Sequence, residues 1–245
     1  MDLTHGLDDF YGKQIIEGFS FRDIHTSDYD MWLVDRFTPP PNEKQIIESL
    51  PFAQGIQDFS MILGARVYEN RELKYTFEIL NRNYQHRKSI ETSLTNWLMN
   101  SDYSELHDDH AQNYHYIAKC RHVDVMDSAG GLSVEVTFDA YPFKIAELLE
   151  GNDIWDTFNF ELDVAQVTEF EVNGTTNITL FNVGSNLITP TIEASSDFEI
   201  TKGNTAYEIS SGTTKSESFF LDMGENRLTI TGNGIIKFNF YKELL

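Results

Sequence analysis

The sequence lacks several features that would assign a chain to a common class of protein. It contains one cysteine, Cys120, in 245 residues, so no intrachain disulfide can form and folding in a reducing cytosol is the simple expectation. No apolar run approaches the roughly 20 residues that a membrane-spanning helix needs. The first residues, MDLTHGLDDFYGK, lack the basic flank and apolar stretch of a signal peptide. We therefore expect no membrane insertion and no signal-directed export.

Basic side chains are also scarce. The 18 Lys and Arg residues stand against 39 Asp and Glu, which gives a formal net charge of −21. A surface this negative repels the phosphates of nucleic acids and of anionic lipids, and no basic stripe reverses the charge locally. We therefore expect no sequence-specific binding to nucleic acid and no binding to a membrane.

Recognisable catalytic patterns are absent as well. No Gly-x-Ser-x-Gly frame is present, and Cys120 lies within an alternating strand pattern that is typical of a core residue. Glu169 and Glu171 would share one strand face, as the acids of a retaining glycosidase do, but solvent-facing acids on a strand are far commoner. The sequence predicts no catalytic residues, no cofactor and no enzyme activity.

The stretch ELHDDHAQNYH concentrates possible metal ligands. It holds His107, His110 and His115 beside Asp108 and Asp109, and His and carboxylate side chains bind zinc and iron. The spacing matches no known metal motif. We expect a polar loop here and no metal site.

The first half of the chain contains both strand and helix periodicity. FSFRDIHTSDYDMWLV reads as two short strands around a polar turn, and KQIIESL is compatible with another. RELKYTFEIL alternates apolar and polar residues from Arg71 to Leu80, which predicts a strand. Ile90, Leu94, Trp97 and Leu98 follow a helical stripe and predict a helix over residues 88–99.

The second half changes character after Glu150. Short alternating stretches separated by turns such as NGT, KGN and GNG predict many short strands, as in a β-sandwich. The strand before this change ends at Pro142, which cannot donate to a strand ladder. KIAELLEG, just beyond, could form one helical turn that connects two domains. We place the boundary between residues 1–148 and 149–245.

Four stretches together resemble the distal tail protein family of long-tailed phages and prophages of Gram-positive hosts. They are FSFRDIHTSDYDMWLV, the pair RELKYTFEIL and SIETSLTNWL, VEVTFDAYPF, and FNVGSNLITPTIEA. Their order and spacing span most of the chain. PFAQGIQDFS departs from the family because it lacks the Gly-Arg-Asp-Gly-like loop.

The resemblance implies a mainly β, two-domain structural protein. The N-terminal domain (1–148), a β-fold with one helix, would form a hexameric ring, and the C-terminal domain (149–245) would be a galectin-like β-sandwich on the outside. Such a hub at the virion tail tip, made in the host cytoplasm, joins the tail tube protein to the tip or hub protein and to baseplate or receptor-binding proteins. Its lumen passes DNA. Two core domains leave no length for an inserted carbohydrate-binding module.

Two further expectations concern particular side chains. An exposed strand edge can pair with a neighbouring subunit around a closed ring, so we expect subunit contacts in three segments near the start and middle of the first domain. The apolar face of the predicted helix, which contains Trp97, could pack against the domain's own core or against a neighbouring subunit. The expected contact residues are Phe19, Phe21, Trp32, Pro39, Pro40, Pro41, Tyr75 and Phe77.

The alternative function is that of a carbohydrate-binding, lectin-like protein that recognises the host. Sandwich domains of this kind invite it, and aromatic rings can stack on sugar rings. In that reading Trp155, Tyr207 and Tyr241 would supply the stacking surfaces.

Overall fold

The computed structural model describes residues 17–245 except 50, 53, 63–64, 82, 129 and 155–157. The chain divides into two compact units, one that ends at Lys144 and one that comprises Ile145–Leu244, whereas the sequence placed the boundary at residue 148. Both units are mainly β, as predicted. Within the described part of the chain, no helix is long and apolar enough to span a membrane.

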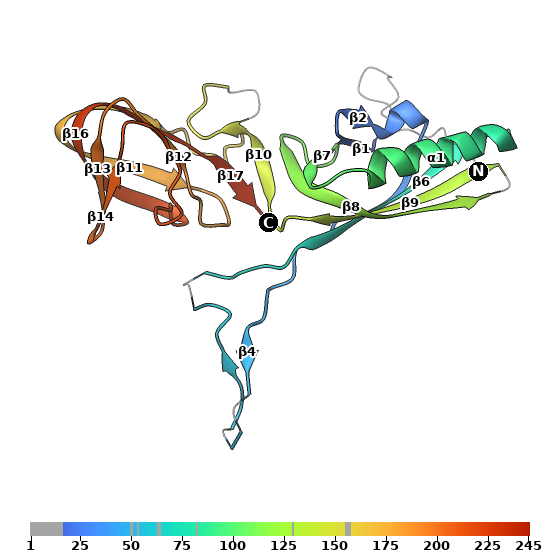
Figure 1. Cartoon of the computed structure of the whole chain (residues 1–245), viewed down its shortest axis with the longest axis horizontal. Helices are drawn as coiled ribbons and strands as arrows, with labels where there is room; N and C mark the ends of the chain where they lie inside the picture. Colours follow the sequence, from blue (N-terminus) through green and yellow to red (C-terminus); the bar gives the residue numbers. More distant parts are fainter. Residues whose placement is uncertain are drawn as a thin grey trace. The chain divides into compact units, whose positions relative to one another are not determined.

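The first unit is built on an antiparallel sheet with the strand order β2-β1-β7-β8-β9-β6-β3 (Figure 1). The short 3-10 helix η1 (Thr26–Tyr29) follows β2, and the helix α1 (Tyr84–Met99) follows β6. The strands are β1 (Phe19–Phe21), β2 (Ile24–His25), β3 (Trp32–Phe37), β6 (Arg71–Leu80), β7 (Ser104–Asp108), β8 (Tyr114–Asp127) and β9 (Gly131–Ala140).

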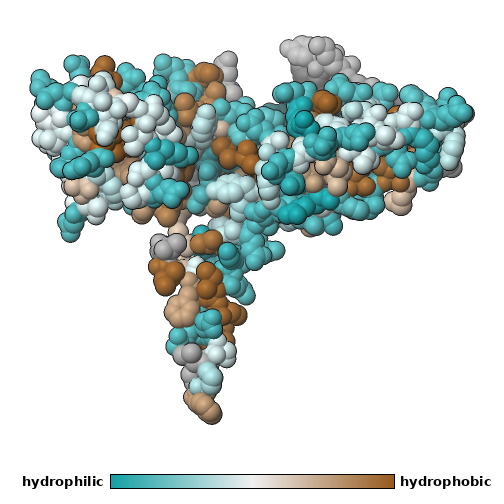
Figure 2. Space-filling model, viewed as in Figure 1, coloured by the Kyte–Doolittle hydropathy of each residue, from teal (hydrophilic) through white to brown (hydrophobic). Residues whose placement is uncertain are grey.

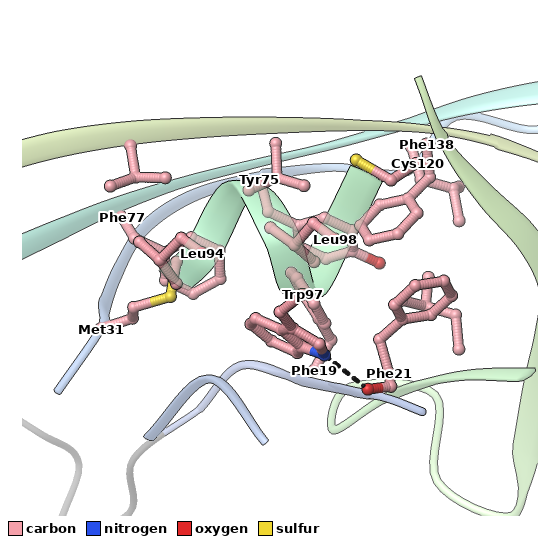
Figure 3. Close-up of a cluster of buried hydrophobic side chains, with 14 of the residues drawn as sticks. Phe19, Phe21, Met31, Tyr75, Phe77, Leu94, Trp97, Leu98, Cys120 and Phe138 are labelled. Atoms are coloured by element: carbon pink, nitrogen blue, oxygen red, sulfur yellow. Dashed lines mark hydrogen bonds between the residues drawn. The ribbon is translucent and has the colours of Figure 1, made fainter. Parts of the chain in front are cut away.

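An aromatic core joins α1 to one face of this sheet (Figure 3). The ring of Phe19 lies at its centre, with centroid distances of 4.9 Å to Tyr75, 5.2 Å to Phe138 and 6.0 Å to Trp97. The alternation predicted for residues 71–80 is confirmed, because Leu73, Tyr75, Phe77 and Ile79 are all buried.

The helix begins four residues before the predicted start at residue 88. Its cap is Asn83, whose side-chain oxygen accepts hydrogen bonds from the backbone N–H groups of Gln85 and His86. The first turn is polar, so apolar periodicity could not reveal it.

An arm, defined here as residues 38–70, leaves the first unit between β3 and β6 (Figure 1). Its strands β4 (Ile47–Glu48) and β5 (Gln57–Asp58) pair antiparallel. A single bridge joins Glu43 to Tyr68 nearer its base. Among the described residues of KQIIESL, only Ile47 and Glu48 form a strand, and the described residues of PFAQGIQDFS lie near the far end of the arm.

The second unit is a curled antiparallel arrangement around the long strand β16 (Gly224–Asn239). β11 (Glu169–Asn182) pairs with β16 along one side, while β13 (Phe198–Lys202) and β12 (Thr191–Ala194) pair with successive parts of its other side. The remaining strands are β14 (Thr205–Ile209), which pairs with β13, β15 (Gly212–Thr214), which pairs with β12, and the mutually paired β10 (Lys144–Leu149) and β17 (Tyr241–Leu244).

Two glycines let β16 bend where its partner changes from β13 to β12. Gly232 has a φ of 153°, and a Cβ built there would lie 2.4 Å from the Phe198 ring. Gly234 has a φ of 135°, a backbone conformation that residues with a side chain rarely adopt, so both positions favour glycine. The bend lets the sheet enclose its own apolar core, which includes Leu180, Ile230 and Phe238.

Two local expectations are wrong. The segment KIAELLEG forms the strand β10 rather than a helical turn. The stretch ELHDDHAQNYH is not one polar loop, because its first residues belong to β7 and its last to β8. Asp108 is buried there, and it accepts a hydrogen bond of 2.9 Å from the Tyr75 hydroxyl and lies 3.0 Å from Arg36 Nη2.

Candidate functional site: the apolar arm and its root

Four of the expected contact residues lie inside the protein. Phe19, Phe21, Tyr75 and Phe77 have no exposed surface, and all four belong to the core of the first unit. Their side chains therefore offer nothing to a second chain. The alternation of apolar residues identifies the face of a strand that is buried. It does not distinguish burial against a helix of the same subunit from burial against another subunit.

The other expected contact residues lie at or near the surface. Trp32 is half-buried on β3, opposite Glu78 and therefore on the sheet face away from α1. Pro39 and Pro41 are half-buried and Pro40 is exposed, at the point where the chain enters the arm. Trp97 faces its own core, since it is 6% exposed and its indole N–H donates to the Phe21 carbonyl at 2.9 Å.

The arm carries a concentration of exposed apolar side chains that sequence reasoning missed. Figure 2 shows hydrophobic residues along this narrow segment. Phe52 is fully exposed at its far end, and Ile62 is 73% exposed. Two strands of two residues cannot bury side chains of this size against each other. The exposed apolar side chains of the arm are Ile46, Ile47, Phe52, Ile56, Phe59, Met61, Ile62 and Val67.

The arm backbone is nevertheless held by a regular set of hydrogen bonds. Lys44 N donates to Val67 O at 2.8 Å, and Phe59 N donates to Ile46 O at 2.8 Å. Ser60 is buried, and its hydroxyl accepts from Ile46 N at 2.8 Å. Its side-chain and backbone hydrogen bonds lower the pKa of Asp58. The described residues of the arm are thus joined by backbone hydrogen bonds and have an apolar exterior.

A buried arginine, Arg71, holds the base of the arm, where the chain leaves β3 and returns to β6, by hydrogen bonds to backbone carbonyls. Arg71 is 6% exposed, and its guanidinium donates to the carbonyl of Thr38 at 3.2 Å and to that of Pro142 at 3.3 Å. It also lies over the Tyr116 ring, 5.2 Å from the centroid. Burial lowers the pKa of Arg71, and among the described residues it has no carboxylate partner. This contact links the start of the arm to the end of β9.

The sheet face away from α1 is acidic. The strand registers place Asp35, Thr76, Glu135 and Asp124 in one row across β3, β6, β9 and β8. Lys119 and Arg121 partly offset this charge, and Arg121 lies 2.8 Å from Asp139. On β3, β6, β8 and β9 the carboxylates of the face are Asp35, Glu72, Glu78, Asp124, Glu135 and Asp139, and the Lys and Arg residues are Lys74, Lys119 and Arg121.

The histidine cluster does not assemble a metal site among the described residues. The rings of His107 and His115 lie 5.5 Å apart on neighbouring strands, and His107 Nε2 lies 3.6 Å from Glu105 Oε2. No third ligand joins them in the part of the chain that is described.

The two expected stacking aromatics that the structure describes, Tyr207 and Tyr241, lie on different sheets. Trp155 lies outside the described residues. Tyr207, on β14, is half-buried and packs edge-on against Phe219 with a centroid distance of 5.1 Å. Tyr241 is 43% exposed on β17, which belongs to a different sheet.

Comparison with known proteins yields similarity of structure but not of sequence. No family model and no curated protein sequence matches the chain. The crystal structure of the SPP1 Dit (gp 19.1) protein, described as a paradigm of the hub adsorption apparatus in phages that infect Gram-positive bacteria, is similar with a TM-score of 0.65 and 14% identity. The match covers 93% of this chain and 98% of that chain, so this protein has the Dit fold.

The baseplate of phage P2 in its activated conformation with Ca is a more distant match. Its TM-score is 0.39 at 8% identity, over 91% of this chain and 93% of that chain, and this likeness adds nothing to the fold assignment.

Proposed function

We propose that this protein is a structural component of a phage tail tip, and that its copies assemble into a hexameric hub. The observation that carries the proposal is the similarity in fold to the SPP1 Dit protein over 93% of the chain. The hub would join the tail tube protein to the tip or hub protein and to baseplate or receptor-binding proteins. It would act as a non-enzymatic part of the virion, after synthesis in the host cytoplasm.

The arm supports self-association by its own chemistry. Exposed apolar side chains gathered in one segment mark an interaction site, because burying them in a partner removes them from water. We assign the subunit contact to the arm, which includes Pro39–Pro41, together with Trp32. Among the described strands β3 is the last of the sheet, so its outer edge is a second surface that a neighbouring copy could cover.

The acidic sheet face supports a passage for DNA. Six carboxylates against three Lys and Arg side chains repel phosphates, so a lumen lined by this face would not retain the DNA that passes through it. The second unit would then lie outside the ring and face the other tail proteins.

Light scattering on the purified full chain tests the ring. We expect a species of six times 28.2 kDa that falls to 28.2 kDa when Ile47, Ile56 and Ile62 are all changed to Ser. The matched control changes three similarly exposed apolar residues of the second unit, Val167, Met223 and Ile235, to Ser and should leave the assembly intact.

Two outcomes would count against the proposal. One is a wild-type chain that stays at 28.2 kDa at high concentration, both alone and when mixed with its tail tube and tip proteins. The other is that the variant with the arm substitutions remains a hexamer while the control variant dissociates into 28.2 kDa monomers.

A further inference from the structure

The second unit carries an open groove of about 360 Å³ on its outer sheet face. The groove crosses three adjacent strands, β13, β16 and β11. The register places Thr201, Thr229 and Asn177 in one row across these strands, with Arg227 and Thr179 paired in the next row. Gly203, with a φ of 61° and no atom near the position of a Cβ, leaves one end open.

The lining is rich in hydroxyl, amide and guanidinium groups. The Thr229 hydroxyl donates to Asn177 Oδ1 at 2.7 Å, which leaves the Asn177 amide N–H groups without a partner among the described residues. Thr179 and Thr201 also present their hydroxyls without a hydrogen-bond partner in that part of the chain. The groove therefore offers several donors and acceptors at once.

Three classes of ligand are disfavoured by the same residues. The apolar lining residues Ile178 and Leu228 are buried, so the floor offers little to an apolar peptide. β16 is paired on both sides here, so no further strand can add to it. Arg227 forms two hydrogen bonds to the carboxylate of Glu225, at 2.8 and 3.4 Å, which offsets the positive charge that a phosphate would need.

We propose that this groove binds a neutral saccharide. A saccharide presents many hydroxyls that both donate and accept, and it needs neither an apolar floor nor an unbalanced charge. Three adjacent strands span about 10 Å, which suits a disaccharide. The lining has no aromatic ring for stacking, so we expect weak binding, with a Kd of about 1 mM. The site differs from the aromatic residues expected from the sequence, and it does not depend on ring formation.

Saturation-transfer NMR on the full chain tests the proposal, because it detects weak ligands whatever the size of the protein. The probes are maltose, lactose, cellobiose and chitobiose, each at millimolar concentration. We expect transfer to at least one of them, and about fivefold weaker binding of that sugar to Thr229→Val and to Arg227→Gln. Thr213→Val, an equally conservative change at an exposed strand position outside the groove, should bind as the wild type does.

Several results would overturn the proposal. Absence of transfer to every disaccharide would do so, as would equal binding by all variants whose circular dichroism and melting temperature match the wild type. Inorganic phosphate added as a competitor should not displace the sugar. Displacement by phosphate would identify an anion site instead.

Discussion

At the scale of single residues, one indole nitrogen connects the helix to the first strand. Trp97 donates to the Phe21 carbonyl, and its ring stacks on Tyr29 with a centroid distance of 5.2 Å. Trp97→Phe keeps a ring in place but leaves that buried carbonyl without its donor. We expect a loss of about 1–3 kcal/mol in the free energy of unfolding, measured by urea denaturation followed by circular dichroism.

Trp32→Phe is the matched control, because Trp32 is only half-buried and donates no hydrogen bond from its indole to a described residue. We expect it to change the unfolding free energy by less than about 0.5 kcal/mol. Equal losses for the two variants would contradict the importance of the buried hydrogen bond.

Sequence reasoning at this scale identified which residues are apolar on one face but not what they contact. Leu73 to Ile79 were recognised because strand alternation has a period of two, and Leu94 to Leu98 because of the helical stripe. Phe19 and Phe21 also alternate with polar residues, and a strand that packs against a neighbouring subunit would show the same alternation. Only the three-dimensional packing around Phe138 and Trp97 places them in the core.

At the scale of elements, the arm depends on the contact made by Arg71 at its root. Arg71→Met keeps the length of the side chain but removes the donors to Thr38 and Pro142. We expect faster amide hydrogen exchange in the arm near its base, measured by mass spectrometry, with little change in α1. Lys74→Met, on the opposite face of the same strand, is the control and should leave exchange unchanged. Unaltered protection of the arm in Arg71→Met would refute this role.

Elements with strong periodicity could be predicted, and elements without it could not. The second unit is mainly β as expected, but of the turns named from the sequence only KGN separates two strands, β13 and β14. NGT lies within the long strand β11 and GNG within β16, so these two expected turns are wrong. The arm has apolar residues in no regular order, because its two short strands have no buried face, and it therefore reads as a loop. β7 and β10 were missed for a related reason: their mixed polar residues match a strand only in the context of the neighbours with which they pair.

At the scale of the whole molecule, charge and apolar contact act in opposite directions on self-association. The net charge of −21 makes copies repel each other, and salt screens that repulsion, with a Debye length of about 10 Å at 0.1 M. Apolar contact through the arm is not weakened by screening. We expect sedimentation velocity to show more assembly in high sodium chloride than in low. Dissociation with added salt would indicate that ion pairs hold the copies together instead.

The apolar exterior of the arm has a consequence for the fate of a copy that finds no neighbour. If copies assemble through the arm as proposed, an unassembled copy would leave Phe52 and Ile62 open to water, where proteases and chaperones could reach them. Assembled copies would shield this segment, and surplus ones would be cut there first. Under the proposed function, turnover would remove unassembled chains selectively and would match the amount of this protein to the number of assembly sites.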